Sequence, residues 1–338
     1  MNKVPVRSEV PVIDIGAMVE SGSDAAVAAV ASQIRVAALG TGFFYVSNHG
    51  VPADAVADVF EANRRFHALP IEEKLKIKRN LWHRGYEALG SSTLKSSARF
   101  EAARKPSQLE SISIRHELDL GHPDYERKPL QGPNQWPADP WFKQVVQRYD
   151  TDVRQLGLKL LHPFAMAVGE KRDYFDRFFS PPTTNLRVIH YPPAAPMREE
   201  DTYGINPHTD YGFMTILAQD DVGGLQVRRV DGTWIDARYI PGTFIINVGD
   251  VLARWTNDVF NSTPHRVISP THSRDRYSVG HFFDPNIDAL IECLPSFQGQ
   301  GKPVRHESIR YGDYFAMRLD ANHPDRVGAP KAAEAPTY

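Results

Sequence analysis

The sequence contains one cysteine, Cys293, among 338 residues, so it can form neither an intrachain disulfide nor a paired-cysteine metal site. A single cysteine favours a reducing, cytoplasmic setting. The first residues lack the apolar core of a secretory signal. No stretch approaches the roughly 18 uninterrupted apolar residues of a membrane span. We therefore expect a cytoplasmic protein with no membrane partner.

Neither sign of charge is in excess. Lys and Arg total 39 against 41 Asp and Glu, for a formal net charge of −2. This balance argues against the broad basic face that binds nucleic acid or anionic membranes. Hydrophobic residues at 41% and charged residues at 24% are typical of a soluble globular protein. We expect a small-molecule partner and no nucleic acid.

The two halves of the chain differ in pattern. Helical periodicity dominates residues 23–40, 54–69 and about 141–168, with β-rich runs at 10–16 and 42–50 and an irregular stretch at 78–136. From residue 185 onward, short β-rich runs alternate with turn residues, at 185–192, 214–219, 224–230, 233–237, 243–250, 251–256 and 276–285. Closely spaced short strands indicate a jelly roll.

We therefore predict a fold that is mainly β with α: a double-stranded β-helix (jelly-roll) core over 181–320, flanked by N-terminal helices in a helix-rich region over 1–180. The two regions are expected to form a single catalytic unit within 1–338, followed by a polar tail at 321–338.

The run "NPHTDYG" places His208 and Asp210 two positions apart. On an extended segment such residues point to the same side, so an imidazole and a carboxylate could face one ion. A polar surface turn would contain the same pair. His265, in a β-like run after a proline, supplies a third candidate ligand. Two histidines and one carboxylate form the facial triad of non-haem Fe(II) oxygenases, but they also suit catalytic zinc.

The run "RDRYSVGHFF" places Arg276 and Ser278 on one face of an expected strand. A guanidinium beside a hydroxyl is well shaped for a carboxylate, and so apolar a strand would not bury an arginine without a partner. A structural salt bridge to a protein carboxylate is the alternative. Phe282 shares this face, and Tyr211 and Phe213 follow the candidate ligands. We expect these three aromatic residues either to line a substrate pocket or to pack in the core.

These motifs resemble those of the Fe(II)- and 2-oxoglutarate-dependent dioxygenases of the isopenicillin N synthase-like family. The similarity extends over most of the chain in the family's order. It is carried by "PVIDIG", "GFFYVSNHGVP", "GPNQWP", "NLRVIHYPP", "HTDYGFMTILAQDDVGGLQV", "GTFIINVGDVLARWTN", "STPHRV" and "RYSVGHFFDPN".

The resemblance implies that His208, Asp210 and His265 bind Fe(II), and that Arg276 and Ser278 bind the distal carboxylate of 2-oxoglutarate. Tyr191 matches a tyrosine that helps to hold the same carboxylate. With O2, such an enzyme would oxidise a small-molecule substrate and release succinate and CO2. Because Asp210 fills the position that related halogenases vacate, hydroxylation, desaturation or cyclisation is favoured over halogenation.

Three other functions compete with this interpretation. An oxidase of the same fold that does not use 2-oxoglutarate would need a similar Arg, Ser and Tyr set. Isopenicillin N synthase also supplies a glutamine near its C-terminus as an iron ligand, and no glutamine follows Gln300 here. A non-catalytic binding protein should have lost a ligand. A zinc hydrolase would not need Arg276 on the face of the site.

Other polar residues are given structural roles. His281 and His190 fall on the strand faces opposite to Arg276 and Tyr191, so we expect both to support the fold. Four residues of the irregular stretch could reach the mouth of the site, although solvated surface positions are the default: Arg84, Tyr86, Arg99 and Arg104.

Overall fold

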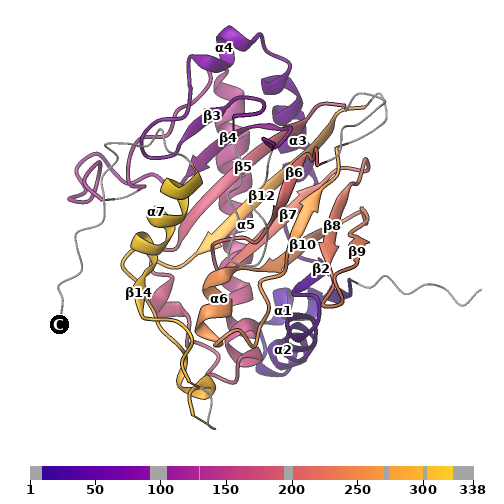
Figure 1. The fold of residues 1–338 in the computed structure, drawn as a ribbon, viewed down its shortest axis with the longest axis vertical. Coiled ribbons are helices and arrows are strands. Elements are labelled where there is room, and N and C mark those ends of the chain that lie inside the picture. Colours follow the sequence, from indigo (N-terminus) through magenta and orange to yellow (C-terminus); the bar gives the residue numbers. More distant parts are fainter. Residues whose placement is uncertain are drawn as a thin grey trace, which may run out of the picture.

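Two β-sheets pack against each other at the centre of the protein, as a computed structural model shows (Figure 1). The structure describes residues 10–91, 105–128, 130–193, 201–269, 274–299 and 303–322. The large sheet has eight strands in the order β1-β2-β10-β7-β12-β5-β4-β3, and the small sheet has four in the order β6-β11-β8-β9. This arrangement is a double-stranded β-helix, so the predicted fold class is confirmed.

The strands of the large sheet are β1 (Val12–Asp14), β2 (Phe43–Ser47), β3 (Gly85–Glu87), β4 (Glu110–Arg115), β5 (Thr183–Tyr191), β7 (Met214–Gln219), β10 (Thr243–Val248) and β12 (Arg276–Asp284). Those of the small sheet are β6 (Ile205–His208), β8 (Leu225–Arg228), β9 (Trp234–Asp236) and β11 (His265–Val267). A separate pair consists of β13 (Leu290–Ile291) and β14 (Ile309–Arg310).

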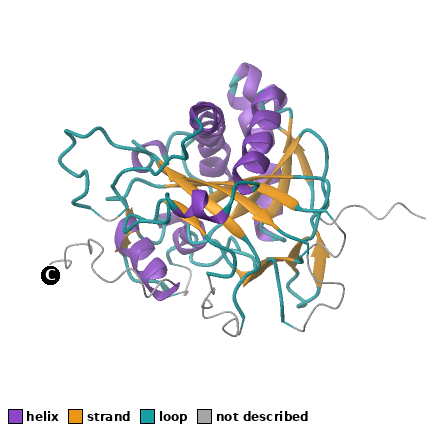
Figure 2. Cartoon of the chain, turned by 90° about the horizontal axis from the view of Figure 1, so that it is seen from above, coloured by secondary structure: helices purple, strands orange, loops and turns teal. Residues whose placement is uncertain are grey.

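The α-helices are α1 (Gly16–Ser21), α2 (Asp24–Leu39), α3 (Ala53–His67), α4 (Ile71–Leu75), α5 (Pro140–Ala167), α6 (Asp250–Trp255) and α7 (Tyr311–Asn322). Two short 3-10 helices occupy Asp176–Phe178 and Pro295–Phe297. Helices α3 and α5 cover the face of the large sheet that points away from the small sheet, and α2 packs along α5 (Figure 2).

Local sequence signals explain the long helices. The Ser23 side chain accepts a hydrogen bond from the Ala26 amide at the start of α2, and Gly40 follows its end. Asp139 caps α5, and Pro140 occupies its first turn, where a missing amide hydrogen costs nothing. The helix continues through Pro163 to Ala167.

The core has two parts because the large sheet is buried on both faces. One hydrophobic cluster fills the space between this sheet and the helices. A smaller cluster lies between the two sheets and draws on β2, β5, β6, β8, β10 and β11. The inner face of the large sheet therefore looks into the barrel, where a site can be enclosed.

One predicted strand is wrong. Residues 251–256 were expected to be extended, but Asp250–Trp255 form helix α6. Val251 and Trp255 are both fully buried and lie four residues apart, which puts them on the same side of a helix. A short apolar run does not distinguish a buried helical turn from a strand.

Strands from the N-terminal region belong to the large sheet. β1 and β2 lie at one edge, and β3 and β4 at the other, where β4 pairs antiparallel with β5. Residues 78–136 are therefore partly regular. Helix α7 extends to Asn322, two residues into the expected tail, whereas residues 323–338 lie outside the described part of the chain.

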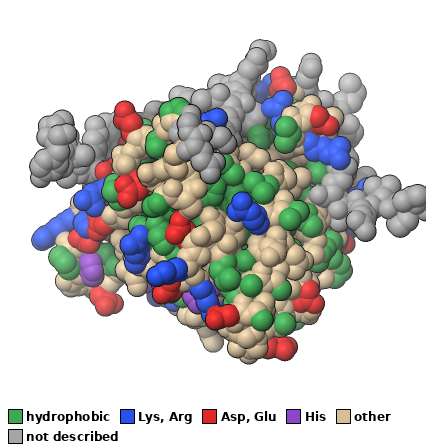
Figure 3. Space-filling model, turned by 90° about the horizontal axis from the view of Figure 1, so that it is seen from below, with side chains coloured by type: hydrophobic (Ala, Val, Ile, Leu, Met, Phe, Trp, Pro, Cys, Tyr) green, Lys and Arg blue, Asp and Glu red, His purple; other side chains and the backbone are tan. Residues whose placement is uncertain are grey.

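Charged side chains of both signs are interspersed on the face drawn in Figure 3. Within the described residues, no helix combines the length and apolar composition that crossing a bilayer requires.

Candidate metal centre

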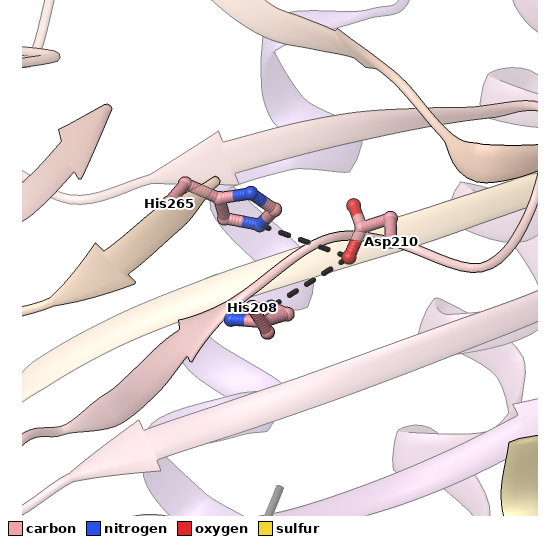
Figure 4. Close-up of side chains that lie close together, drawn as sticks. All are labelled: His208, Asp210 and His265. Carbon is pink, nitrogen blue, oxygen red and sulfur yellow. Dashed lines mark ion pairs between the residues drawn. The ribbon is translucent and has the colours of Figure 1, made fainter. Parts of the chain in front are cut away.

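His208, Asp210 and His265 converge at one point at the edge of the small sheet. His208 ends β6 and His265 begins β11, and the antiparallel register places the two residues directly opposite each other. Asp210 follows in the turn after β6. Figure 4 shows the three side chains directed toward one another, with Asp210 Oδ1 at 3.6 Å from His208 Nε2 and 3.7 Å from His265 Nε2.

The distances suit a shared cation. One candidate ligand atom from each residue lies within 4.8 Å of the others, as expected for groups that bind one ion at about 2 Å each. The structure thus brings His265 to the neighbouring pair His208 and Asp210, from which it is distant in the sequence, and the surface-turn alternative for that pair is wrong.

Backbone carbonyls orient both imidazoles. His208 Nδ1 lies 2.8 Å from the Asn206 carbonyl oxygen, and His265 Nδ1 lies 3.1 Å from that of Thr263. A carbonyl only accepts, so each Nδ1 must carry a hydrogen, and Nε2, which faces Asp210, is the ring nitrogen left to bind a metal. This tautomer is the one that binds a metal through Nε2.

Two side chains orient the carboxylate. The Thr215 hydroxyl donates to Asp210 Oδ2 at 2.5 Å, and the Asn247 amide donates to the same oxygen at 2.7 Å. Oδ2 is thereby occupied, and Oδ1 remains directed at the histidines. Thr215 and Asn247 pair across β7 and β10, so the large sheet fixes the carboxylate presented by the small sheet's loop.

The charge states match a metal site. Burial and, to a smaller extent, proximity to His265 lower the pKa of His208 to about 3, so this imidazole is neutral near pH 7. Burial raises the pKa of Asp210, but the two imidazoles and the hydrogen bonds from Thr215 and Asn247 outweigh it, so this pKa is lowered overall. Neutral imidazoles and an ionised carboxylate are the forms that coordinate a cation.

A cavity of about 810 Å³, including its open mouth, is lined by His208 and Asp210. Its walls come from the inner face of the large sheet, the loop after β6 and helix α7, and the residues other than the candidate ligands are His83, Glu87, Ser107, Leu109, Ser113, Arg115, Asn185, Arg187, Ile205, Thr209, Tyr211, Gly212, Phe282, Asp284, Phe315, Leu319 and Asn322.

Two of the three aromatic residues expected in a substrate pocket line this cavity, Tyr211 and Phe282. Phe213 does not line it, so of its two expected roles the pocket role is wrong and core packing is confirmed. Its side chain is fully buried, and its ring packs against those of Phe175, Phe179 and Trp255 in the hydrophobic core. Residues two apart on a strand would point to the same side, but Gly212 lies in a turn, so Tyr211 faces the cavity and Phe213 faces the core.

Arg276, Ser278 and Tyr191 lie deeper, between the sheets, and each side chain is only 1% exposed. Tyr191 packs in the same cluster as Ile205 and Val267, from the strands that carry His208 and His265. Arg276 pairs with Tyr191 across β12 and β5, and its guanidinium lies 4.6 Å from the centre of the tyrosine ring. None of the three lines the cavity described above.

Arg276 is buried and forms no ion pair within 4.0 Å among the described residues, although its charge acts on nearby Asp220, whose pKa it lowers against the larger raising effect of burial. Its Nε donates to the Gly223 carbonyl at 2.5 Å, and its Nη2 contacts Gln219 Oε1 at 3.4 Å. Its Nη1 is buried and has no hydrogen-bond partner in the described part of the chain. An orphaned donor on a buried cation fits the carboxylate of an absent anion, and the protein salt bridge expected as the alternative is not found there.

Other predicted residues lie away from the cavity. Arg84 and Tyr86 are 1% exposed rather than solvated. Arg84 donates to the carbonyls of His116 and Leu130. Arg99 and Arg104 lie outside the described residues. His281 is fully buried and contacts Asp150, in agreement with its expected structural role.

Several residues of the site were not identified from the sequence. Asn185 and Arg187 share the inward face of β5 with Tyr191, so counting in steps of two from Tyr191 would have found them. Asn247 is a polar residue within the apolar run of β10, which was a usable signal. No local signal indicated Thr215 or the contribution of α7.

Comparison with known proteins agrees with this geometry. Residues 10–139 match the model described as non-haem dioxygenase in morphine synthesis N-terminal, and residues 182–285 match that of the 2OG-Fe(II) oxygenase superfamily. The chain is 35% identical over 303 residues to the 2-oxoglutarate-Fe(II) type oxidoreductase hxnY of Emericella nidulans, which covers 86% of this chain and 84% of that protein. It is 34% identical over 332 residues to a homoarginine-6-hydroxylase of Arabidopsis thaliana, covering 92% and 97%.

Among solved structures, a Neurospora crassa protein in complex with alpha-KG and thymine superposes with a TM-score of 0.80. It is 30% identical and covers 94% of this chain and 98% of its own. The fold and the donor set define a non-haem iron oxygenase. The chain belongs to the Fe(II)- and 2-oxoglutarate-dependent dioxygenases of the isopenicillin N synthase-like family. It is an oxidoreductase that uses Fe(II), 2-oxoglutarate and O2 to oxidise a small molecule, with release of succinate and CO2.

Proposed function

We propose that His208, Asp210 and His265 bind the iron. The convergence of two lone-pair-bearing Nε2 atoms and one free carboxylate oxygen supports this assignment. Three protein ligands leave coordination positions for a 2-oxo acid and O2, and iron bound here would supply the oxidising chemistry. The remaining chemistry of the chain is to position the reactants and to exclude water.

We further propose that Arg276 binds the distal carboxylate of 2-oxoglutarate through Nη1, with Tyr191 and Ser278 beside it. The buried orphaned donor is the supporting observation. A charge-assisted hydrogen bond in this dry interior would compensate the cost of burying the guanidinium. Ile189, where many plant members of the family have an asparagine, packs in the apolar cluster between the sheets and adds no polar contact there.

The cavity is proposed to hold the primary substrate, with Phe282 and Tyr211 as apolar walls. The Arg187 guanidinium is held by Glu87 at 3.0 Å and by Ser111 at 2.9 Å, and it lines the cavity. Asn185 Oδ1 is buried there and has no hydrogen-bond partner among the described residues. A free acceptor beside a guanidinium favours a small polar substrate with an N–H group, and argues against a wholly apolar one.

The relatives are consistent with such a substrate, since one is named for homoarginine and another was crystallised with thymine. Because Asp210 occupies the carboxylate position, we propose hydroxylation, desaturation or cyclisation of this substrate rather than halogenation.

Residues 1–180 and 181–320 are proposed to act as a single catalytic unit. The first region supplies Glu87, Ser113 and Arg115 to the cavity, and the second supplies Asn185 and Phe282. Neither region alone would enclose a substrate.

The test is a screen for succinate formation with a panel of small polar and apolar metabolites, supplied with Fe(II), 2-oxoglutarate and O2. The His208→Ala variant serves as the blank. We expect succinate above the blank, increased by substrates that carry N–H groups. Succinate production unaffected by His208→Ala would contradict the metal assignment, and stimulation by apolar compounds alone would contradict the substrate class.

A further inference from the structure

A network of charged groups lies on the outer face of the large sheet, behind Tyr191 and Arg276, and all of its members except the exposed Asp275 are buried. His190 is at its centre. Its Nδ1 lies 2.8 Å from Glu110 Oε1 and its Nε2 lies 2.7 Å from Asp275 Oδ1. Lys74 donates to Glu110 Oε2 at 2.8 Å, and the Tyr86 hydroxyl donates to the same oxygen. His190, Glu110, Lys74 and Tyr86 are all buried.

The network is adjacent in sequence to the residues proposed to bind 2-oxoglutarate. His190 precedes Tyr191 on β5, and Asp275 precedes Arg276 at the start of β12. Successive residues of a strand point to opposite faces, so the network lies outside the barrel and the anchor inside it. The contact between His190 and Asp275 thus joins the two backbone positions next to Tyr191 and Arg276.

Three neighbouring strands are held together at this point. Glu110 of β4 is the register partner of His190 on β5, and Tyr277 of β12 is its partner on the other side. The rings of His190 and Tyr277 stack with centroids 4.9 Å apart. From α3, the Asn63 amide donates to the carbonyls of Ile189 and Ser278, one on each strand.

Stability alone does not account for this network. Buried ion pairs lose solvation on folding, and well-packed apolar residues often stabilise a core as well. A carboxylate accepts only, so contacts from both ring nitrogens to carboxylates require a doubly protonated imidazole. Hydrogen bonds between charged groups have a preferred direction and length, so they fix the position of β5 relative to the start of β12.

We propose that His190 is a positioning residue for the 2-oxoglutarate anchor, and that its links to Glu110 and Asp275 set the relative placement of Tyr191 and Arg276. This inference rests on the proposed role of Arg276 and Tyr191 in binding the distal carboxylate.

The first test is the His190→Phe variant, which keeps a ring against Tyr277 and removes both hydrogen bonds. Displacing an anchor by a fraction of an ångström weakens binding of the ligand it holds. We expect the KM for 2-oxoglutarate to rise about tenfold, with kcat at saturating 2-oxoglutarate changed less than about twofold. Calorimetric titration of 2-oxoglutarate into the Mn(II)-loaded, anaerobic protein should show the same loss without turnover.

His281→Phe is the matched control. His281 is buried on the same face of the same sheet, and its Nε2 contacts the Asp150 carboxylate at 3.1 Å. It pairs with Leu186, away from the anchor end of β5. The control variant should lose stability but retain the affinity for 2-oxoglutarate.

The second test is the pH dependence. Burial lowers the pKa of His190, but the hydrogen bonds that it donates to Glu110 and Asp275 outweigh this effect, and the pKa is raised above 6.5 overall. As the pH rises through this value, one ring nitrogen loses its hydrogen and one link is lost. The KM for 2-oxoglutarate should therefore increase at alkaline pH in the unmodified enzyme and be flat in His190→Phe.

Other groups around His190 do not imitate this response. Burial lowers the pKa of His67, 5.4 Å away on α3, to about 3. The pKa of Tyr277 is raised to about 12 by burial. Burial opposes the ionisation of Glu110, but hydrogen bonds from His190, Lys74 and Tyr86 lower its pKa to about 2. The faces packed against His190 carry the following titratable groups: His67, Lys74, Tyr86, Glu110, Asp275 and Tyr277.

The outcomes separate this inference from the proposed function. If Arg276→Leu weakens 2-oxoglutarate binding and His190→Phe does not, the positioning role is refuted and the anchor stands. If neither variant changes the affinity, the anchor itself is wrong. Should His190→Phe fail to fold, two other measurements decide. The proposal is overturned if Glu110→Gln keeps the affinity for 2-oxoglutarate and if the KM for 2-oxoglutarate of the unmodified enzyme does not change with pH.

Discussion

The hydrogen bonds to Asp210 give the sharpest quantitative prediction. Thr215→Val removes one of the two donors to Oδ2 while keeping the shape of the side chain. The lost hydrogen bond, at 2.5 Å to an ionised group, corresponds to about 1.5–3 kcal/mol. The hydrogen bond is present with and without the metal, so part of this free energy is lost from both forms and does not change metal affinity. The remainder is lost only from the metal-bound form and weakens metal binding. We expect the affinity for Fe(II) to fall by about tenfold to a hundredfold.

The expected loss of Fe(II) affinity has a structural cause that can be tested separately. Without the Thr215 hydroxyl, only Asn247 holds Oδ2, so Asp210 Oδ1 is less firmly directed at the imidazoles. The pKa of Asp210 should also rise, because a hydrogen bond that lowers it is gone. As the pH falls, metal affinity should therefore be lost at a higher pH in the variant than in the unmodified protein.

The assay is anaerobic calorimetric titration with Fe(II), repeated with Asn247→Ala and the double variant. Since both donors share one acceptor, the double variant should deviate from additivity. Thr256→Val is the control: this buried threonine donates to the Leu252 carbonyl, away from the centre, and its loss should reduce stability alone. Equal Fe(II) affinity in Thr215→Val and in the unmodified protein would refute the reasoning.

Three further predictions concern packing, ionisation and the cavity. Gly157→Ala should destabilise the fold by about 1–3 kcal/mol in urea unfolding, because a Cβ there would lie 2.4 Å from the Phe283 ring; an unchanged midpoint would show that the helix can shift. Burial raises the pKa of Asp284 from 3.8 to about 6, so the folded, metal-free protein keeps this carboxyl protonated where the unfolded chain has lost the proton. The free energy of unfolding therefore falls as the pH rises through this interval, by up to about 3 kcal/mol. Asp284→Asn should remove that loss, and unfolding at pH 4 and pH 8 would reveal it; an identical pH dependence in both proteins would contradict it. Phe282→Trp should narrow the cavity and raise the KM for the primary substrate while leaving the KM for 2-oxoglutarate unchanged; a parallel rise in both would place Phe282 at the co-substrate instead.

Two kinds of sequence signal were informative about the site. Period-two spacing placed Arg276, Ser278 and Phe282 on one strand face, and the structure agrees because side-chain alternation is a local property of an extended backbone. The ordered motifs of the family identified the three candidate metal ligands. Predictions based on apolar content alone were weaker, as the helix at Asp250–Trp255 and the core position of Phe213 show.

The sequence by itself determined the residue types, their strand faces and the family to which the chain belongs. Only the tertiary structure decided which residues meet. The register between β6 and β11 sets His208 opposite His265, and Thr215 and Asn247 reach Asp210 from strands of the other sheet. The network at His190 likewise joins helices and strands that are distant in the sequence. Such contacts depend on how sheets and helices pack, and no short stretch of sequence contains that information.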